Sequence, residues 1–312
     1  MKYLFLSFAA LAVLFVAMSF HIEPDPKTPE ALGERLFNDA LLSSDQSVSC
    51  ATCHIPAFGF GDTTAVSEGV RGQLGTRNTP GITNMTYRAS YFWDGRAATL
   101  EAQVVGPIEN PVEMDLPLPV AIERLRKSAR YDAWFKQIYG RSADTTALAD
   151  ALAAFVRTLE TGDSPFDRWM NGDANAMSQS AVRGRQIFLN KGKCFDCHFG
   201  PDFTGDEFRN IGLFDGEKLN DKGRFAISKK TEDMGRFKVP GLRNVAVTAP
   251  YMHDGHYNTL REVIDYYDQP DRFGIKSIGR DSLLRTPLGL TEQEKTDLEN
   301  FLLALTDSRF KQ

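Results

Sequence analysis

The sequence predicts a mainly α-helical protein built from two related halves. Helical periodicity recurs along the chain, strand-like runs are few, and long segments rich in Gly, Pro and Asn join the helical stretches. The motif C-x-x-C-H occurs once in each half, as CATCH at residues 50–54 and as CFDCH at residues 194–198. A pattern used twice at long spacing indicates a structural unit used twice. The 312 residues suffice for two domains of about 100 to 200 residues each.

Two of the predicted helices carry clear sequence signals. The stretch TPEALGERLF, at residues 28–37, places Thr28 as an N-cap and Pro29 in the first turn. The stretch LTEQEKTDLENFLLALT, at residues 290–306, has helical spacing that puts four apolar residues on one face: Leu298, Phe301, Leu302 and Leu305. We therefore expect an amphipathic helix near each end of the chain.

A break inside a third amphipathic stretch marks the predicted domain boundary. ADALAAFVRTLETGDSPFDRWM, at residues 149–170, has helical spacing but is interrupted by GDSP at residues 162–165. Glycine and proline in this order end one helix and start another. We therefore expect an N-terminal domain over residues 28–163 and a C-terminal domain over residues 164–312, with long loops inside them.

Both C-x-x-C-H motifs are typical of covalent attachment of c-type haem. In this motif the two cysteines form thioethers to the porphyrin, and the histidine that follows binds the iron. A zinc ribbon would need its two C-x-x-C units within roughly 15 to 20 residues, and a redox dithiol would need a βαβ context. We therefore expect two haem c groups, which fill the cores of the helical domains and are held by Cys50, Cys53, His54, Cys194, Cys197 and His198.

The repeat extends past the histidines and predicts what lies on the other side of each iron. Two pairs of dipeptides recur at identical spacing: Asp94-Gly95 with Asp254-Gly255, and Thr99-Leu100 with Thr259-Leu260. The same spacing then brings Pro107 into register with Tyr267. Tyrosine is a known haem ligand, whereas proline has no ligand atom. The sequence therefore predicts an open first iron and a second iron bound by Tyr267, with Tyr266 as the alternative if the register shifts by one.

Composition and the N-terminal segment narrow the class of protein. The net charge of −5 comes from 36 basic and 41 acidic residues without a basic block, which argues against nucleic acid as a partner. Residues 1–20 place one lysine before an unbroken apolar run, which is typical of a secretory signal peptide. The run is also long enough for an uncleaved N-terminal anchor, which stays the alternative. We expect an exported protein of the periplasm or cell envelope.

Four further segments make the sequence resemble the bacterial di-haem cytochrome c peroxidase and MauG family. They are TRNTPGITN at residues 76–84, FWDGRAATLEAQVVGPIENPVEM at 92–114, DKGRFA at 221–226 and GLRNVAVTAPYMHDG at 241–255. The resemblance covers about residues 28–307. It implies two cytochrome c-like domains, with a peroxidatic haem in the first, an electron-transfer haem in the second and a calcium ion between them. It also implies hydrogen peroxide as substrate and a small electron-donor protein, and it leaves open whether the chain forms a homodimer.

The resemblance also assigns roles to single residues. Trp93 matches a tryptophan between the two haem groups, where it would relay electrons. Gln103, Pro107 and Glu113 match residues of the distal pocket above the first iron. Glu113 would be the acid/base that moves a proton between the two peroxide oxygens, which requires a carboxyl group with a raised pKa.

A calcium site is implied between the domains. Asn78, together with the backbone carbonyls of Thr248 and Pro250, matches the calcium ligands of the family. Oxygen ligands of this kind suit the ion.

Two departures from the peroxidases point toward MauG-like proteins. Many family peroxidases carry a histidine that closes the peroxidatic iron, and Val70 stands at the matching position. Peroxidases supply methionine to the second iron, where this chain has Tyr267. A third position points the other way. MauG has a tryptophan two residues before its second haem motif, on the route to its protein substrate, and here that position is Gly192. Its absence argues against a protein-modifying role like that of MauG.

Three functions follow from these observations. The first is a cytochrome-c peroxidase-type oxidoreductase, which reduces hydrogen peroxide to water with electrons from a cytochrome c or a cupredoxin. The second is a MauG-like oxidase of a protein or small-molecule substrate. The third is a di-haem electron carrier or sensor that is not an enzyme.

Overall fold

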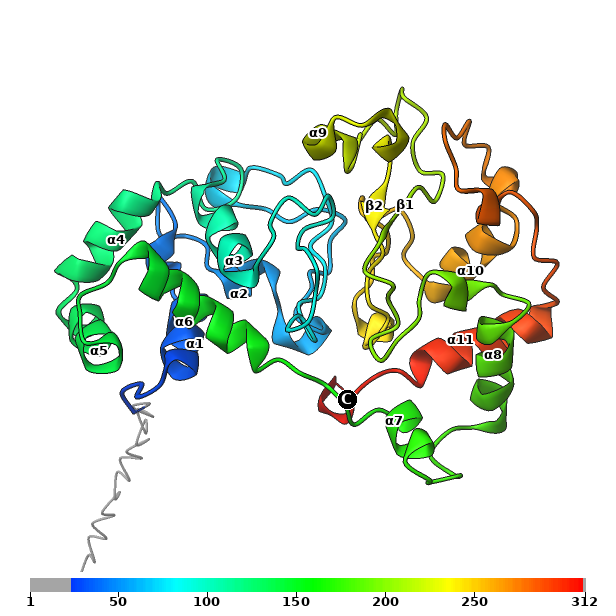
Figure 1. Ribbon diagram of the computed structural model, residues 1–312, viewed down its shortest axis with the longest axis horizontal. Coiled ribbons are helices and arrows are strands. Elements are labelled where there is room, and N and C mark those ends of the chain that lie inside the picture. Colours follow the sequence, from blue (N-terminus) through cyan, green and yellow to red (C-terminus); the bar gives the residue numbers. More distant parts are fainter. Residues whose placement is uncertain (1–23, 311–312) are drawn as a thin grey trace, which may run out of the picture.

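The computed structural model of the chain describes residues 24–310, so the predicted signal segment, 1–20, lies outside the described residues. These residues form a mainly helical protein, as the sequence predicts, and the helices gather in two lobes (Figure 1). The first lobe contains α1 (Pro29–Asn38), α2 (Cys50–Cys53), α3 (Leu100–Glu109), α4 (Leu118–Lys127), α5 (Ala129–Tyr139) and α6 (Thr145–Arg157). The second contains α7 (Pro165–Met170), α8 (Gln179–Leu189), α9 (Phe225–Ser228), α10 (Leu260–Asp268) and α11 (Glu292–Leu303).

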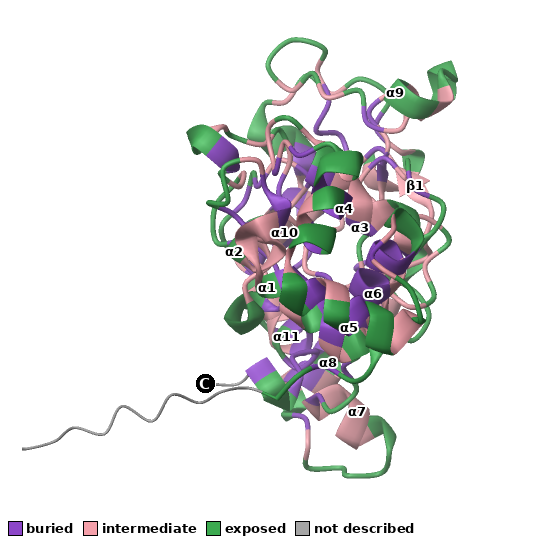
Figure 2. Ribbon diagram, turned by 90° about the vertical axis from the view of Figure 1, so that its left-hand side faces the viewer, coloured by how far each residue is buried: buried purple, intermediate pink, exposed green. Residues whose placement is uncertain are grey.

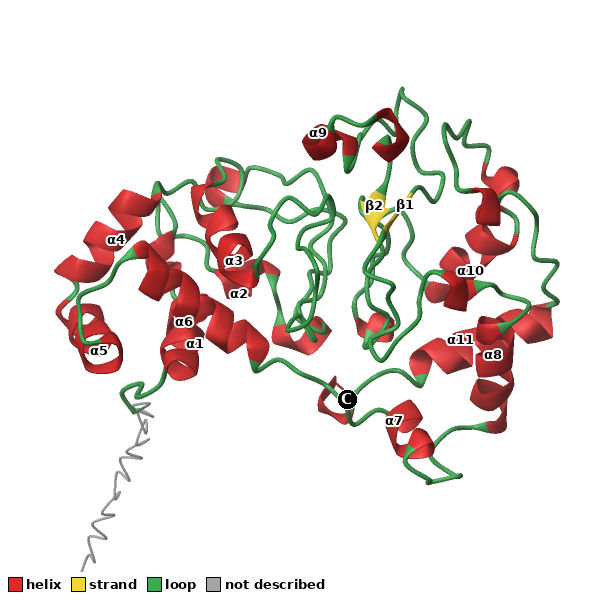
Figure 3. Ribbon diagram, in the orientation of Figure 1, coloured by secondary structure: helices red, strands yellow, loops and turns green. Residues whose placement is uncertain are grey.

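Strands are short within the described part of the chain. β1 (Phe208–Arg209) pairs antiparallel with β2 (Phe237–Lys238), with Phe208 opposite Lys238 and Arg209 opposite Phe237. Long loops make up most of the remaining backbone, above all on the sides where the lobes face each other (Figure 3). No helix among residues 24–310 combines the length and the apolar character needed to cross a bilayer.

The helix signals in the sequence are confirmed. The Thr28 side chain accepts a hydrogen bond from the Ala31 N–H and caps α1. At α11, Thr291 and Glu294 form a reciprocal capping box. The apolar face predicted for this helix is buried, since Leu298, Phe301, Leu302 and Leu305 are each no more than 7% exposed.

The predicted interruption near residue 162 is also present. α6 ends at Arg157 and α7 begins at Pro165, where Ser164 forms a capping box with Asp167. Residues 158–164 form the link between the lobes at the bottom of Figure 1.

One helix crossing is built twice, once in each half. α1 crosses α6 at Gly33, and a Cβ atom there would lie 1.9 Å from the carbonyl oxygen of Ala151. α8 crosses α11 at Gly184, where a Cβ atom would lie 1.9 Å from the carbonyl oxygen of Asp297. The stretches LGERLF, at residues 32–37, and RGRQIF, at residues 183–188, share the pattern Gly-x-x-aliphatic-Phe. The glycine of this pattern marks the point where two helix backbones touch, and both crossings are visible in Figure 1.

We expect Gly33→Ala to lower the free energy of unfolding by about 1 to 3 kcal/mol, because the added methyl group has no space at the crossing. Denaturant unfolding of the haem-loaded protein measures this change. Gly162→Ala is the matched control, since a Cβ atom at residue 162 would meet nothing within 4 Å, and we expect its effect to stay within about 0.5 kcal/mol. Equal effects of both substitutions would contradict the crossing as the cause.

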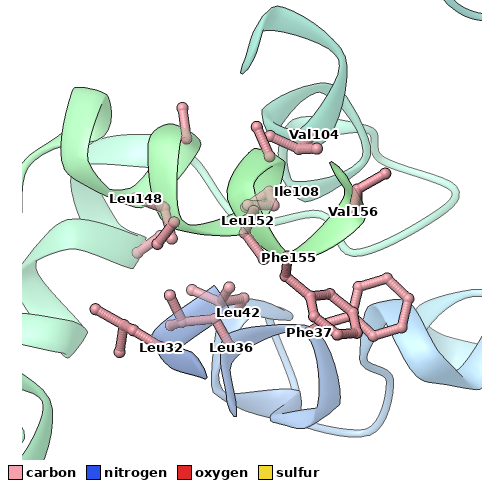
Figure 4. Close-up of a cluster of buried hydrophobic side chains, with 14 of the residues drawn as sticks. Leu32, Leu36, Phe37, Leu42, Val104, Ile108, Leu148, Leu152, Phe155 and Val156 are labelled. Carbon is pink, nitrogen blue, oxygen red and sulfur yellow. The ribbon is translucent and has the colours of Figure 1, made fainter. Parts of the chain in front are cut away.

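Each lobe has its own hydrophobic core. In the first, side chains from α1, α3 and α6 meet, among them Leu32, Leu36, Ile108 and Leu152 (Figure 4). The second core joins α8, α10 and α11. Buried residues gather between the helices and exposed ones on their outer sides (Figure 2).

The chain returns to the first lobe after α11. Phe310 is buried in the first core, with its ring centroid 6.4 Å from that of Phe60. Asp307 accepts hydrogen bonds from the N–H groups of Gly162 and Asp163, which fixes this return at the link between the lobes. The domain limits 28–163 and 164–312 stay a prediction, and Phe310 packs across them.

Candidate functional site

Both motif histidines are held in the same way. His54 follows α2, and its Nδ1 lies 2.8 Å from the carbonyl oxygen of Phe60. His198 Nδ1 lies 2.9 Å from the carbonyl oxygen of Phe203. A carbonyl oxygen only accepts, so Nδ1 carries the hydrogen and Nε2 keeps a free lone pair. Burial lowers the pKa of both imidazoles, which keeps them neutral, as a metal ligand must be.

A connected cavity of about 800 Å³ reaches both motifs. Its walls include all six motif residues: Cys50, Cys53, His54, Cys194, Cys197 and His198. The lining is largely apolar elsewhere, with side chains such as Leu100, Val104, Leu260 and Ile264. An apolar cavity with a cysteine pair and a neutral histidine at each end fits haem c.

The alternative uses of the cysteines find no support among the described residues. The four cysteines form no disulfide there, and no three His, Cys, Asp or Glu side chains gather in residues 24–310 as ligands of a metal ion. Burial raises the pKa of the Cys50 and Cys194 thiols to about 12, so neither is a reactive thiolate.

The distal residues predicted for the first iron line this cavity. Gln103 and Pro107 extend from α3, and Glu113 lies in the turn that follows. Val70 is fully buried in the first core and is not part of the cavity wall. Its N–H donates to the carbonyl oxygen of Glu113 at 2.8 Å, so the loop carrying Val70 supports the backbone of Glu113.

Glu113 has an environment suited to holding a proton. Burial raises the pKa of its carboxyl group, and a hydrogen bond from Asn110 and the positive charge of Arg96 offset this only in part. Asn110 Nδ2 donates to Glu113 Oε1 at 2.6 Å, which fixes the direction of the carboxyl group. A carboxyl group of raised pKa can take up and release a proton closer to neutral pH than an exposed glutamate can.

The geometry separates the two tyrosines that the sequence left as alternatives. Tyr266 is fully buried away from the cavity, and its hydroxyl donates to the carbonyl oxygen of Ile211 at 2.7 Å. Tyr267 lines the cavity, and its hydroxyl forms no hydrogen bond with any other described residue. Burial raises the pKa of the Tyr267 phenol far above its usual value, so without a cation nearby it stays neutral.

Trp93 lines the same cavity as the two motifs. Its turn is closed by pairing of Tyr91 with Ala97, and its indole Nε1 donates to the carbonyl oxygen of Asn78 at 2.8 Å. A hydrogen bond to a backbone group fixes the plane of the indole.

The residues predicted to bind calcium, Asn78, Thr248 and Pro250, all line the same cavity. The Asn78 Nδ2 donates to the carbonyl oxygens of Thr64 and Ala65, at 3.2 and 3.3 Å. The amide is thereby oriented, and its Oδ1 accepts no hydrogen bond from the described residues. A free amide oxygen beside carbonyl groups is compatible with a hard cation.

Sequence reasoning missed two basic residues on the cavity wall, Arg88 and Lys238. Both side chains are 11% exposed, and burial lowers the pKa of Lys238 to about 8. They follow no motif of their own, and only the fold brings them beside the cavity. Each is paired with a carboxylate of the second lobe, Arg88 with Asp202 at 3.6 Å and Lys238 with Asp206.

Comparisons with known proteins agree with this geometry. A family model described as di-haem cytochrome c peroxidase matches residues 27–175. The methylamine utilization protein MauG of Methylorubrum extorquens is 39% identical over 91% of this chain and 80% of its own length. Cytochrome-c peroxidase IdrP1 of Denitromonas iodatirespirans is 37% identical, over 88% of this chain and 81% of its own length.

A solved structure supports the same assignment. A MauG-like protein associated with microbial copper homeostasis superposes with a TM-score of 0.83, at 30% identity, over 92% of this chain and 93% of its own. This family implies haem c as the cofactor of both C-x-x-C-H motifs. From the paired haem motifs, the shared fold and the similarity along most of its length, the chain belongs to the di-haem cytochrome c peroxidase family.

Proposed function

We propose that the chain is an exported di-haem peroxidase, which reduces hydrogen peroxide to water with electrons from a small redox protein such as cytochrome c or a cupredoxin. The observation that carries this proposal is Glu113, a partly buried carboxyl group of raised pKa on the cavity that His54 also lines. Pro107, on the same cavity, offers no ligand atom, so space is left for a small substrate. Membership in a family that includes proteins named cytochrome c peroxidases supports it.

The residues around the first motif would bind and orient the substrate. When bound, the haem groups supply the electrons and the iron that peroxide meets. Glu113 accepts a proton from one peroxide oxygen and returns it to the other as the O–O bond breaks, which gives water as the leaving group. Two electrons from the small redox protein and two protons from solution complete the reduction to two water molecules. Gln103 lies on the same wall and would hold the peroxide by hydrogen bonding.

The second motif would handle electrons. Cys194, Cys197 and His198 would hold the second haem, and Tyr267, on the same cavity, would be a further ligand of its iron. Trp93 lines the cavity that both motifs share and would relay electrons from the second haem to the first.

Steady-state turnover tests this function. The haem-loaded protein should reduce hydrogen peroxide with a reduced small cytochrome c or cupredoxin much faster than free haem does. Turnover no faster than free haem, together with two low-spin haem signals in the oxidised protein, would instead favour an electron carrier or sensor.

A MauG-like oxidase is the second candidate, favoured by Tyr267 on the cavity and by Val70 at the place of the closing histidine. Such an enzyme would keep two oxidising equivalents until its substrate arrives. Peroxide added without an electron donor should then cause a long-lived change of the absorption spectrum. Gly192 provides no redox-active side chain at the place where MauG has a tryptophan, which is why the peroxidase is our first candidate.

Calcium is the other cofactor that we propose, bound by the Asn78 side chain and by the carbonyl oxygens of Thr248 and Pro250. At a calcium concentration of about 100 times its dissociation constant, the ion should stabilise the chelator-treated protein by about 2.7 kcal/mol. Asn78→Ala should abolish this calcium-dependent part in a thermal unfolding series. Asn175→Ala, at an exposed loop residue, is the control that should keep it. A calcium response that Asn78→Ala leaves intact would contradict the site.

A further inference from the structure

The turn that carries Trp93 is held from the second lobe. The Lys238 N–H, at the end of β2, donates to the carbonyl oxygen of Trp93 at 2.8 Å. The guanidinium group of Arg224 donates to the carbonyl oxygens of Asp94 and Gly95, at 2.9 and 3.2 Å. Figure 1 shows β2 and α9 on the side of the second lobe that faces the first. Backbone groups of this turn thus find their partners across the gap between the lobes.

Arg77 joins a carboxylate of each lobe. Its Nε and one Nη donate to the two carboxylate oxygens of Asp221, at 2.6 and 2.9 Å, and its other Nη donates to Asp94 at 2.7 Å. The three side chains are only 18%, 28% and 6% exposed. A bidentate pair of this kind fixes both distance and angle, and partial burial protects it from screening by salt.

Arg77 also stands next to the group that receives the Trp93 indole. Asn78 follows it in the chain, and the Asn78 carbonyl oxygen accepts from Trp93 Nε1. Arg77 therefore fixes Trp93 in two ways. Its guanidinium group binds Asp94, the residue that follows Trp93, and its backbone adjoins Asn78, whose carbonyl oxygen accepts the hydrogen bond of the indole.

Asp221 is itself held ready for this contact. The Gly223 N–H donates to Asp221 Oδ1 at 2.8 Å, which orients the carboxylate toward Arg77. Burial would raise the pKa of Asp221, but the hydrogen bonds from Arg77 and Gly223 outweigh it, and the pKa is lowered. Asp221 is therefore ionised at neutral pH.

We infer that Asp221 is a positioning residue, which sets the indole of Trp93 on the wall of the cavity that both haem motifs line, by acting through Arg77. The contact between Arg77 and Asp221 also joins the two lobes. Docking of the second lobe onto the first therefore places Trp93 at the same time. This inference rests on the proposed function, in which Trp93 carries electrons between the two sites.

Asp221→Asn tests it, because the change keeps the shape of the side chain and removes its charge. Ultraviolet resonance Raman spectroscopy of the haem-loaded protein reports the hydrogen bond of an indole N–H. The chain has three tryptophans, so subtracting the spectrum of Trp93→Phe isolates Trp93. In Asp221→Asn the Trp93 band should shift toward a weaker hydrogen bond. The kcat for peroxide should fall on the order of tenfold or more with KM unchanged, because the substrate pocket is intact while the relay is displaced. Asp221→Glu should restore part of both.

Asp202→Asn is the matched control. Asp202 also joins the lobes, since it accepts from Asn84 of the first lobe at 3.2 Å and pairs with Arg88 at 3.6 Å, yet it makes no contact with the Trp93 turn. We expect Asp202→Asn to leave the Trp93 band where it is, even where the thermal midpoint falls.

The two readouts separate the inference from the function. If Asp221→Asn leaves both the Trp93 band and kcat unchanged, or if Asp202→Asn shifts the band equally, Asp221 does not position Trp93. If the wild-type protein shows no peroxide turnover, the proposed function fails, and the Raman band alone still decides whether Asp221 sets the indole.

Discussion

Glu113→Gln should lower kcat/KM for hydrogen peroxide by about 10² to 10⁴-fold, the usual contribution of a positioned proton-transfer group. Gln has nearly the same shape and can still accept the hydrogen bond from Asn110, but it cannot take up the peroxide proton. Steady-state turnover with a reduced small cytochrome, at several peroxide concentrations, measures the change.

Glu109→Gln is the control for this substitution. Glu109 is the last residue of α3, is exposed and is absent from the cavity wall. Its replacement should leave kcat/KM within a factor of about two, because surface changes of this kind are usually close to neutral. Unchanged turnover in Glu113→Gln would sink the proton-transfer role.

The raised pKa of Glu113 also predicts two pH dependences. To accept a proton, the carboxyl must be ionised, so kcat/KM of the wild type should fall as pH falls through this raised pKa.

The free energy of unfolding should change with pH in the opposite direction. Burial favours the protonated form in the folded state, and this contribution is complete below the unfolded pKa of about 4.3 and is lost as pH rises through the folded pKa. As pH rises from about 4.3 to the raised pKa of Glu113, the free energy of unfolding of the wild type should therefore fall relative to that of Glu113→Gln. Unfolding curves of both proteins at several pH values measure this difference.

Tyr267→Phe should remove the ligand of the second iron, and this change should dominate the spectrum of the oxidised protein. A six-coordinate signal should be replaced by that of an open site, because phenylalanine has no donor atom. Replacement of the anionic tyrosinate by methionine should raise the reduction potential of the second haem, since a thioether stabilises the oxidised form less. Electron paramagnetic resonance and a redox titration measure these two effects.

Tyr266→Phe is the matched control, one residue away on α10. It removes the hydrogen bond to Ile211 and leaves the cavity wall as it is. The spectrum should stay that of the wild type. Loss of the six-coordinate signal in Tyr266→Phe and not in Tyr267→Phe would reverse the assignment.

The same variants separate the two candidate functions. If peroxide alone gives a long-lived spectral change in the wild type that disappears in Tyr267→His, the MauG-like oxidase is favoured. Rapid bleaching of the wild type without a donor would count against it.

Sequence reasoning worked where short-range chemistry decides the structure. The two haem motifs, the N-cap at Thr28 and the buried face of α11 all follow from spacing of a few residues. The register of the internal repeat predicted Tyr267 and left Tyr266 as the alternative, because a shift by one residue turns the helix by about 100° and presents a different side chain. Only the packing of α10, which turns Tyr266 toward Ile211, separates them.

Contacts between the lobes could not be predicted in this way. Arg77 and Asp221 lie in motifs far apart in the chain, and the sequence of neither motif indicates that the two residues form an ion pair. Arg88 and Lys238 are ordinary basic residues in sequence, and burial beside the cavity gives them their importance. Val70 was predicted from the family pattern to stand at the place of a closing histidine, and the fold shows a side chain buried in the first core.

The return of the chain to the first lobe bears on how the protein folds as it is made. Phe310 belongs to the first core, although it follows the whole second lobe in the sequence. Domains generally fold in the order of synthesis, N-terminal first. Here the first lobe lacks one of its buried aromatic side chains until the residues that follow α11 have been synthesised, so its final packing is completed only after the second lobe has been made. The two halves repeat one plan, but they mature as a single unit.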